Sequence, residues 1–109
     1  MGWIETFGVA IAAASLAVSS CDAADVAAGK KKVAVTCAVC HGLDGLSKNP
    51  EARNLAGNNA RYLVKQLNAF KSGDRKNGMM AAVVKTLSDD DVANVAAWYS
   101  GLKVSVTVP

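Results

Sequence analysis

Hydrophobic and small residues recur at helical spacing in three stretches of the chain. These stretches run from about Asp25 to Cys40, from about Asn59 to Ser72 and from about Asp89 to Ser100. Spacings of three and four place such residues on one face of a helix. The resulting stripes are Val26, Gly29, Val33 and Cys37, then Leu63, Leu67 and Phe70, then Val92, Val95, Ala96 and Tyr99. The pattern predicts an all-α fold with three main helices.

The ends of these stretches carry residues that start or stop helices. Asp25 and Ser88 are good N-cap residues, and the acidic run 89–91 is favourable at the positive end of a helix. Gly73 and Gly101 are typical of helix C-termini. The boundaries therefore support the three predicted helices.

Gly29 lies inside the first predicted helix, where glycine costs about 1 kcal/mol relative to alanine. A glycine in such a position often marks the close approach of another element. Two long segments, His41–Asn58 and Asp74–Leu87, lack helical spacing and are predicted as loops. Because long loops in compact domains are usually functional, we expect them to carry part of a site.

The N-terminal stretch has a different composition. Residues Phe7–Ser20 are uncharged and mostly small and apolar. This length suits the hydrophobic region of a signal peptide and is short of the ~20 residues that a spanning helix needs. We predict that residues 1–23 form a signal peptide or N-terminal membrane anchor and that residues 24–109 form the folded domain. A signal peptide normally begins with a basic region, but Glu5, and no Lys or Arg, precedes this apolar stretch. A retained anchor therefore stays an alternative.

Cys21 ends the sequence Val18-Ser19-Ser20-Cys21, which resembles a bacterial lipoprotein box. We favour the alternative that this cysteine is discarded with the signal or lies just beside it. In both cases the chain crosses a membrane. We therefore predict a periplasmic or exported protein, attached to a membrane only if the leader is retained or Cys21 is lipidated.

Charge narrows the choice of partner. All twelve Lys and Arg lie from Lys30 onward, and the part from Ala24 carries seven acidic residues, which gives a formal charge of +5. Aromatic residues do not interleave with the basic ones, which argues against nucleic acid as a partner. Steering toward an acidic partner protein is the better interpretation.

The most specific motif is Cys37-Ala38-Val39-Cys40-His41. C-x-x-C-H is the attachment sequence of a c-type haem. A structural zinc site needs four ligands, whereas the chain has three Cys and one His in total and Cys21 lies in another segment. A plain disulfide leaves His41 unexplained. A thioredoxin-like fold would need strands on both sides of the motif, and the sequence predicts none there. We predict one covalent haem c, attached to Cys37 and Cys40 with His41 on its iron. A porphyrin would also add apolar bulk to a chain that is only 6% aromatic.

The opposite face of such a haem needs a second ligand. Gly78-Met79-Met80 lies in the second predicted loop and holds the only methionines beyond Met1. Buried methionines are more often core residues than ligands. The C-x-x-C-H motif reverses that balance, so one of these two is the predicted second iron ligand.

The arrangement from about Asp25 to Leu102 resembles the class I c-type cytochromes. The resemblance rests on a first helix ending in C-x-x-C-H, on Leu55-Ala56-Gly57 before the Tyr62–Leu67 helix, and on a methionine loop before Leu87-Ser88-Asp89 and a last helix. It implies the cytochrome c fold, with three main helices and loops wrapped around one haem. It also implies that the first and last helices cross, with Gly29 meeting Trp98.

Two departures from that family pattern matter. Members usually have a proline before the L-x-G run, and its carbonyl accepts a hydrogen bond from the ligand histidine. Arg53 stands at that place and Pro50 lies earlier, which leaves open whether a different carbonyl orients His41. The methionine is also doubled. Its spacing to Leu87 favours Met80 as the iron ligand, with Met79 as the second choice.

His41 and Met80 together would leave no open position for a substrate, and a thioether ligand favours Fe(II). The predicted function is therefore electron transport between redox partner proteins, a donor and an acceptor, and not catalysis. Two alternatives remain open. One is a membrane-tethered haem c subunit of a larger dehydrogenase or respiratory complex. The other is an enzyme or gas sensor, which would need both methionines off the iron.

Overall fold

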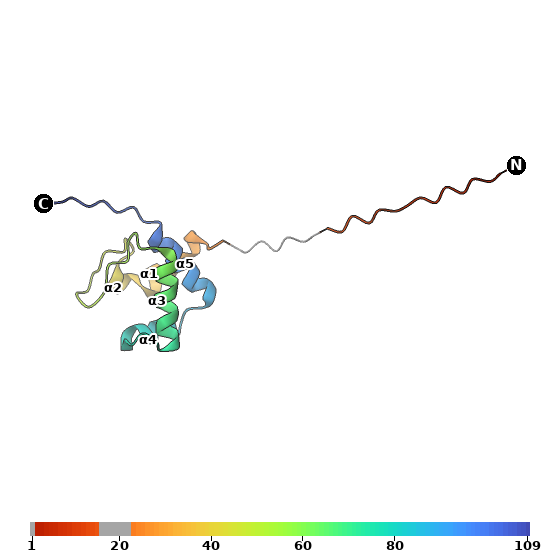
Figure 1. Ribbon diagram of the computed structural model, residues 1–109. Coiled ribbons are helices and arrows are strands. Elements are labelled where there is room, and N and C mark those ends of the chain that lie inside the picture. The colour runs from red at the N-terminus through yellow and green to blue at the C-terminus, as the bar shows by residue number, and fades with distance from the viewer. Residues whose placement is uncertain (1, 16–22) are drawn as a thin grey trace.

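The computed structural model describes residues 2–15 and 23–109 of the chain. Within those residues all regular structure is helical (Figure 1). The helices are α1 (Val26–Thr36), α2 (Ala38–His41), α3 (Ala60–Ser72), α4 (Gly78–Val84) and α5 (Asp89–Ser100). The predicted all-α fold is confirmed.

The predicted ends of the second and third helices are confirmed as α3 and α5. The Asn59 side chain caps α3 by accepting from the Tyr62 backbone N–H, and α3 stops at Gly73, whose φ is +84°. Ser88 and Asp91 form a capping box at the start of α5, in which each side chain accepts from the other residue's N–H at 3.0 Å. Local sequence therefore sets these boundaries.

The first predicted helix is divided in two. It begins at the predicted cap, Asp25, but α1 ends at Thr36 and α2 starts at Ala38. Cys37 between them has φ −113° and ψ −32°, so the prediction of one helix to Cys40 is wrong at this residue. The β-branched residues Val35 and Thr36 come just before the break and weaken a helix at its last turn.

The second predicted loop, Asp74–Leu87, contains a helix and is a further correction. Asn77 starts α4 by accepting from the Met80 backbone N–H at 3.0 Å. Val84 belongs to one of the two apolar clusters of the core, and Met80, four residues earlier, packs against that cluster. Seven residues are too few to show a helical period, and α4 depends on this packing for its stability.

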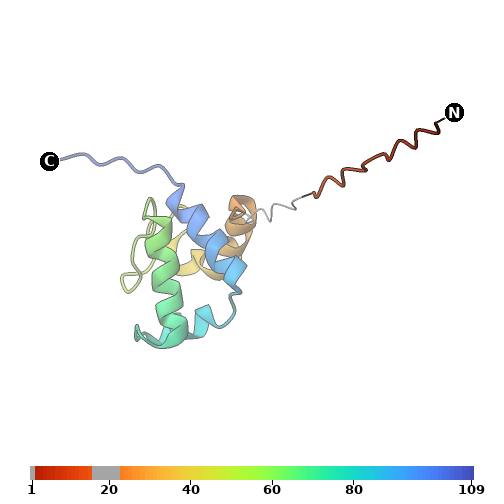
Figure 2. The same cartoon turned by 45° about the vertical axis from the view of Figure 1, so that its right-hand side comes forward.

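Helices α1 and α5 lie side by side (Figure 2). Gly29 is buried at their crossing. A Cβ atom at Gly29 would lie 3.3 Å from Cβ of Trp98 and only 2.6 Å from the carbonyl carbon of Asn94. The predicted meeting of Gly29 with Trp98 is confirmed, but the backbone of Asn94 is the closer obstacle. Asn94 also accepts a hydrogen bond from the Asp25 backbone N–H at 2.8 Å.

The core consists of two apolar clusters joined by α3. Val33, Leu63, Val95, Ala96 and Tyr99 form the first, and Val84, Leu87 and Val92 form the second. Val64 and Leu67 of α3 pack against both. Since Cys37 touches the first cluster and Met80 the second, α3 connects the two halves of the predicted site.

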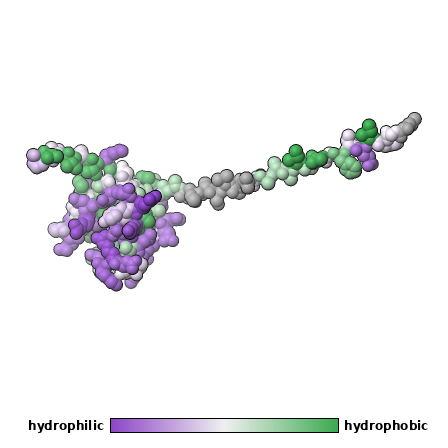
Figure 3. All heavy atoms as spheres, viewed as in Figure 1, coloured by the Kyte–Doolittle hydropathy of each residue, from purple (hydrophilic) through white to green (hydrophobic). Residues whose placement is uncertain are grey.

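Hydrophilic residues cover most of the visible face of the helical domain, whereas hydrophobic residues gather in the N-terminal and C-terminal segments (Figure 3). Residues 2–15 form no helix or strand. No helix in the described residues is long and apolar enough to cross a membrane. Part of the predicted leader, including Cys21, lies outside the described residues, so the leader stays a prediction.

Gly29→Ala should destabilise the protein although alanine is the better helix former. The added methyl group meets the Asn94 backbone, and overpacking typically costs about 1–3 kcal/mol. Gly29→Val should cost more. Gly78→Ala is the matched control, because a Cβ there meets nothing within 4 Å. Denaturant unfolding measures all three, and a stabilising Gly29→Ala would contradict the crossing.

Stability should depend on pH through Asp91. The Ser88 N–H, with help from Lys32, holds the pKa of Asp91 below its ordinary value. Such a carboxylate stabilises the fold above its unfolded pKa of about 4, and this stabilisation is lost as pH falls through the lower folded pKa. Asp91→Asn should therefore destabilise the protein at neutral pH, by an amount that shrinks in acid. Asp90→Asn removes a charge from the same helix end, and an equal effect would contradict the role of the capping box.

Candidate functional site

The three residues of the C-x-x-C-H motif lie within one short segment of chain. Cys37 is at the α1–α2 junction, and Cys40 and His41 are on α2. Cys37 and Cys40 are both free thiols, and all three residues are partly buried. Gly42, with φ +76°, ends α2 in a backbone conformation that favours glycine.

His41 is oriented by a main-chain acceptor. Its Nδ1 lies 2.7 Å from the carbonyl oxygen of Arg53. A carbonyl can only accept, so Nδ1 donates this bond, and in the neutral tautomer that it selects Nε2 offers its lone pair to a metal. The acceptor of His41 is therefore the carbonyl at the position where the class I c-type cytochromes usually have proline, and not a different carbonyl. Main-chain oxygens do not depend on side-chain identity, which explains why arginine can stand there.

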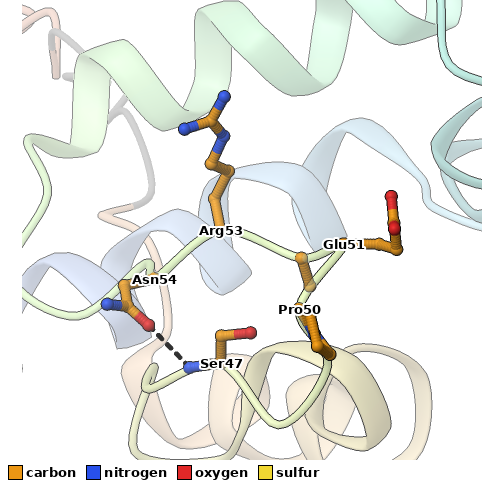
Figure 4. A pocket seen from close by; sticks show the side chains of 6 residues that line it. Ser47, Pro50, Glu51, Arg53 and Asn54 are labelled. Carbon is orange, nitrogen blue, oxygen red and sulfur yellow. Dashed lines mark hydrogen bonds between the residues drawn. The ribbon is translucent and has the colours of Figure 1, made fainter.

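The loop that carries Arg53 is held by several hydrogen bonds. The Asn54 side chain accepts from the Ser47 N–H at 2.7 Å (Figure 4). The Leu55 N–H donates to the Gly45 carbonyl at 2.8 Å. A cavity of about 610 Å³ is lined by Ser47, Pro50, Glu51, Ala52, Arg53 and Asn54. The predicted loop therefore does contribute to the site, by fixing the acceptor of His41.

Helix α5 holds the chain just beyond His41. The hydroxyl of Tyr99, a residue only 1% exposed, donates to the Gly42 carbonyl at 2.9 Å. Nε1 of Trp98 donates to the Leu43 carbonyl at 2.8 Å. The sequence predicted these two aromatic residues for packing and missed their hydrogen bonds. The available signal was their polar atoms, because buried Tyr and Trp usually find an acceptor.

Burial raises the pKa of two groups at the site, Cys37 of the motif and Tyr99 of α5. It raises the pKa of the Cys37 thiol to about 11, although nearby Lys32 acts in the opposite direction. Burial also raises the pKa of Tyr99. At neutral pH both groups are protonated and uncharged. Before haem is attached, Cys37 is therefore a neutral thiol beside an apolar cluster.

The two methionines have different surroundings. Met80 is partly buried and packs with Val84, Leu87 and Val92. Met79, the second choice in the sequence, is 69% exposed. The structure thus gathers Cys37, Cys40 and His41 in one place and holds Met80 on a different element, packed against α3. The side-chain environment favours Met80 over Met79 as the one available to a buried group.

This donor set fits a covalently bound haem. Two cysteine thiols, an imidazole oriented through its Nδ1 and a partly buried thioether are the groups that a c-type haem uses. Within the described residues, no three His, Cys, Asp or Glu side chains gather as they would around a protein-held metal ion.

The family model described as Cytochrome c matches residues 26–103. The chain belongs to the cytochrome c family. The matched span includes all five helices and the C-x-x-C-H motif. The cofactor of this cytochrome c domain is covalently attached haem c, as the motif predicted.

Cytochromes c4 and c-554(548) are similar to this cytochrome c domain. Cytochrome c4 of Pseudomonas aeruginosa is 45% identical over 84 residues, which are 77% of this chain and 41% of that protein. Cytochrome c-554(548) of Halomonas halodenitrificans is 43% identical over 81 residues, which are 72% of this chain and 96% of that protein.

A solved structure shows the same fold. Reduced cytochrome c4 from Pseudomonas stutzeri superposes with a TM-score of 0.69 at 43% identity, over 77% of this chain and 48% of that one. The chain therefore spans about half the length of the c4 proteins that it matches. The cytochrome c fold predicted from the resemblance is confirmed.

Replacing each methionine in turn tests the second iron ligand. Met80→Ala should convert low-spin haem to a high-spin or water-bound form and lower the reduction potential, because the thioether is lost. Met79→Ala should leave the spin state and the reduction potential unchanged. It should change the free energy of unfolding by no more than about 0.5 kcal/mol, as for most exposed positions. Absorption and redox titration of the purified haem protein measure both. The reverse pattern would move the ligand to Met79.

Proposed function

We propose that this cytochrome c domain carries single electrons between redox partner proteins. The observation that carries the proposal is the bond from His41 to Arg53, because it leaves Nε2 of His41 free beside two free thiols. Haem, when bound, supplies an iron that alternates between Fe(II) and Fe(III). The rest of the function depends on how the chain's residues hold it.

Each proposed site residue has a separate role. The thiols of Cys37 and Cys40 would hold the haem through two thioether bonds, and Nε2 of His41 would bind its iron. Met80 would be the second iron ligand, and its thioether would favour the reduced state. With both of these ligands supplied by the protein, the iron would have no position left for a substrate. This supports an electron carrier and not an enzyme.

The proposed partners are an electron donor and an electron acceptor with acidic contact surfaces. The domain is basic from Lys30 onward, and opposite charge accelerates encounter at low ionic strength. We also propose that residues 1–23 direct export, so that residues 24–109 act in the periplasm or outside the cell.

The test is haem attachment in variants of the motif. Cys37→Ser or Cys40→Ser should leave at most one thioether, which intact mass and extraction of haem with acidic solvent detect. His41→Ala should abolish the low-spin spectrum, since the chain holds no other histidine. Val39→Ala, inside the motif but 87% exposed and with no proposed bond to haem, is the control. An unchanged low-spin spectrum in His41→Ala would overturn the proposed site.

A further inference from the structure

Arg53, whose carbonyl orients His41, also carries a permanent positive charge on its side chain. Its carbonyl oxygen lies 2.7 Å from Nδ1 of His41, and a guanidinium stays protonated at all ordinary pH values. Every amino acid supplies a main-chain carbonyl. The hydrogen bond therefore does not use the arginine side chain, whose distinctive property is its charge.

No acidic side chain in the described residues forms an ion pair with Arg53. The ion pairs there are Lys32–Asp91, Lys48–Asp44 and Lys71–Asp89. Arg53 and Glu51 line the same cavity, but their side chains leave the loop at separate points and the guanidinium extends toward α3 (Figure 4). The charge of Arg53 is thus not cancelled by a neighbour.

The backbone around Arg53 is held in place on both sides. Asn54, the next residue, accepts from Ser47 through its side chain at 2.7 Å and from the Asn58 side chain through its carbonyl at 3.2 Å. The Ala52 N–H on the other side donates to the Asn49 carbonyl at 2.9 Å. The positive side chain therefore starts from a fixed point next to the acceptor of His41.

We propose that Arg53 is an electrostatic tuning residue, which favours the reduced state of the haem through its charge while its carbonyl positions His41. Oxidation adds one positive charge at the iron, and a nearby positive charge opposes that step. The side chain is exposed, so dissolved salt should weaken the effect. The inference rests on the proposed ligation by His41.

Redox titration of the holoprotein tests the inference. Arg53→Gln should lower the midpoint potential, so that the ratio of oxidised to reduced haem at the parent's midpoint rises about two- to threefold, as expected of one water-screened unit charge. Arg53→Lys should stay close to the parent, and Arg53→Glu should shift further than Arg53→Gln. High salt should reduce all of these differences.

Lys31→Gln is the matched control. It makes the same change in net charge from an exposed position of α1, away from the stripe of buried Gly29 and Val33. An equal shift in Lys31→Gln and Arg53→Gln, or no shift in Arg53→Glu, would overturn the inference.

The absorption spectrum distinguishes the two proposals. All Arg53 variants keep the carbonyl, so they should keep a low-spin spectrum. The motif variants of His41 and the cysteines test the ligation itself. Loss of the low-spin spectrum in Arg53→Lys would show a structural role for the side chain and would also overturn the inference.

Discussion

The close approach of α1 and α5 at Gly29 is the contact on which the rest of this structure depends. No side chain separates Gly29 from the Asn94 backbone. Helix α5 therefore packs closely against α1, and its last turn lies beside the segment that follows α2. From that position Trp98 and Tyr99 donate to the carbonyls of Leu43 and Gly42. The segment that follows His41 is thereby tied to the far end of the chain. One small residue thus couples the helix crossing to the haem motif.

The second half of the domain depends on α3. Val64 and Leu67 pack against the cluster that includes Cys37 and against the cluster that includes Met80. The elements that bear the two proposed iron ligands are therefore connected through apolar contact with one helix. A covalently attached haem would add apolar surface to a core with only eight buried hydrophobic residues in the described chain. Cofactor and fold are expected to stabilise one another.

The backbone and the side chain of Arg53 have different roles. The main chain of Arg53 sets the tautomer of His41, a task that needs no particular side chain. The guanidinium takes no part in that bond, and its proposed role is to oppose oxidation of the haem through its charge. Elsewhere the basic side chains are mostly exposed, where salt screens them and they affect encounter with partners more than stability. The motif and the fold place the chain in its family, and we propose that Arg53 adjusts the reduction potential.

The sequence alone determined the helix boundaries at Asn59, Gly73 and Ser88, because caps and glycine stops act within a few residues. It also determined the haem motif, which lies within five consecutive residues. Only the tertiary structure decided the helical state of Gly78–Val84, since a seven-residue helix needs packing against α3. The same holds for the acceptor of His41, twelve residues away at Arg53, and for the bonds from Trp98 and Tyr99 that cross more than fifty residues. Such contacts depend on how distant segments meet in space, and a periodic pattern along the chain does not record that meeting.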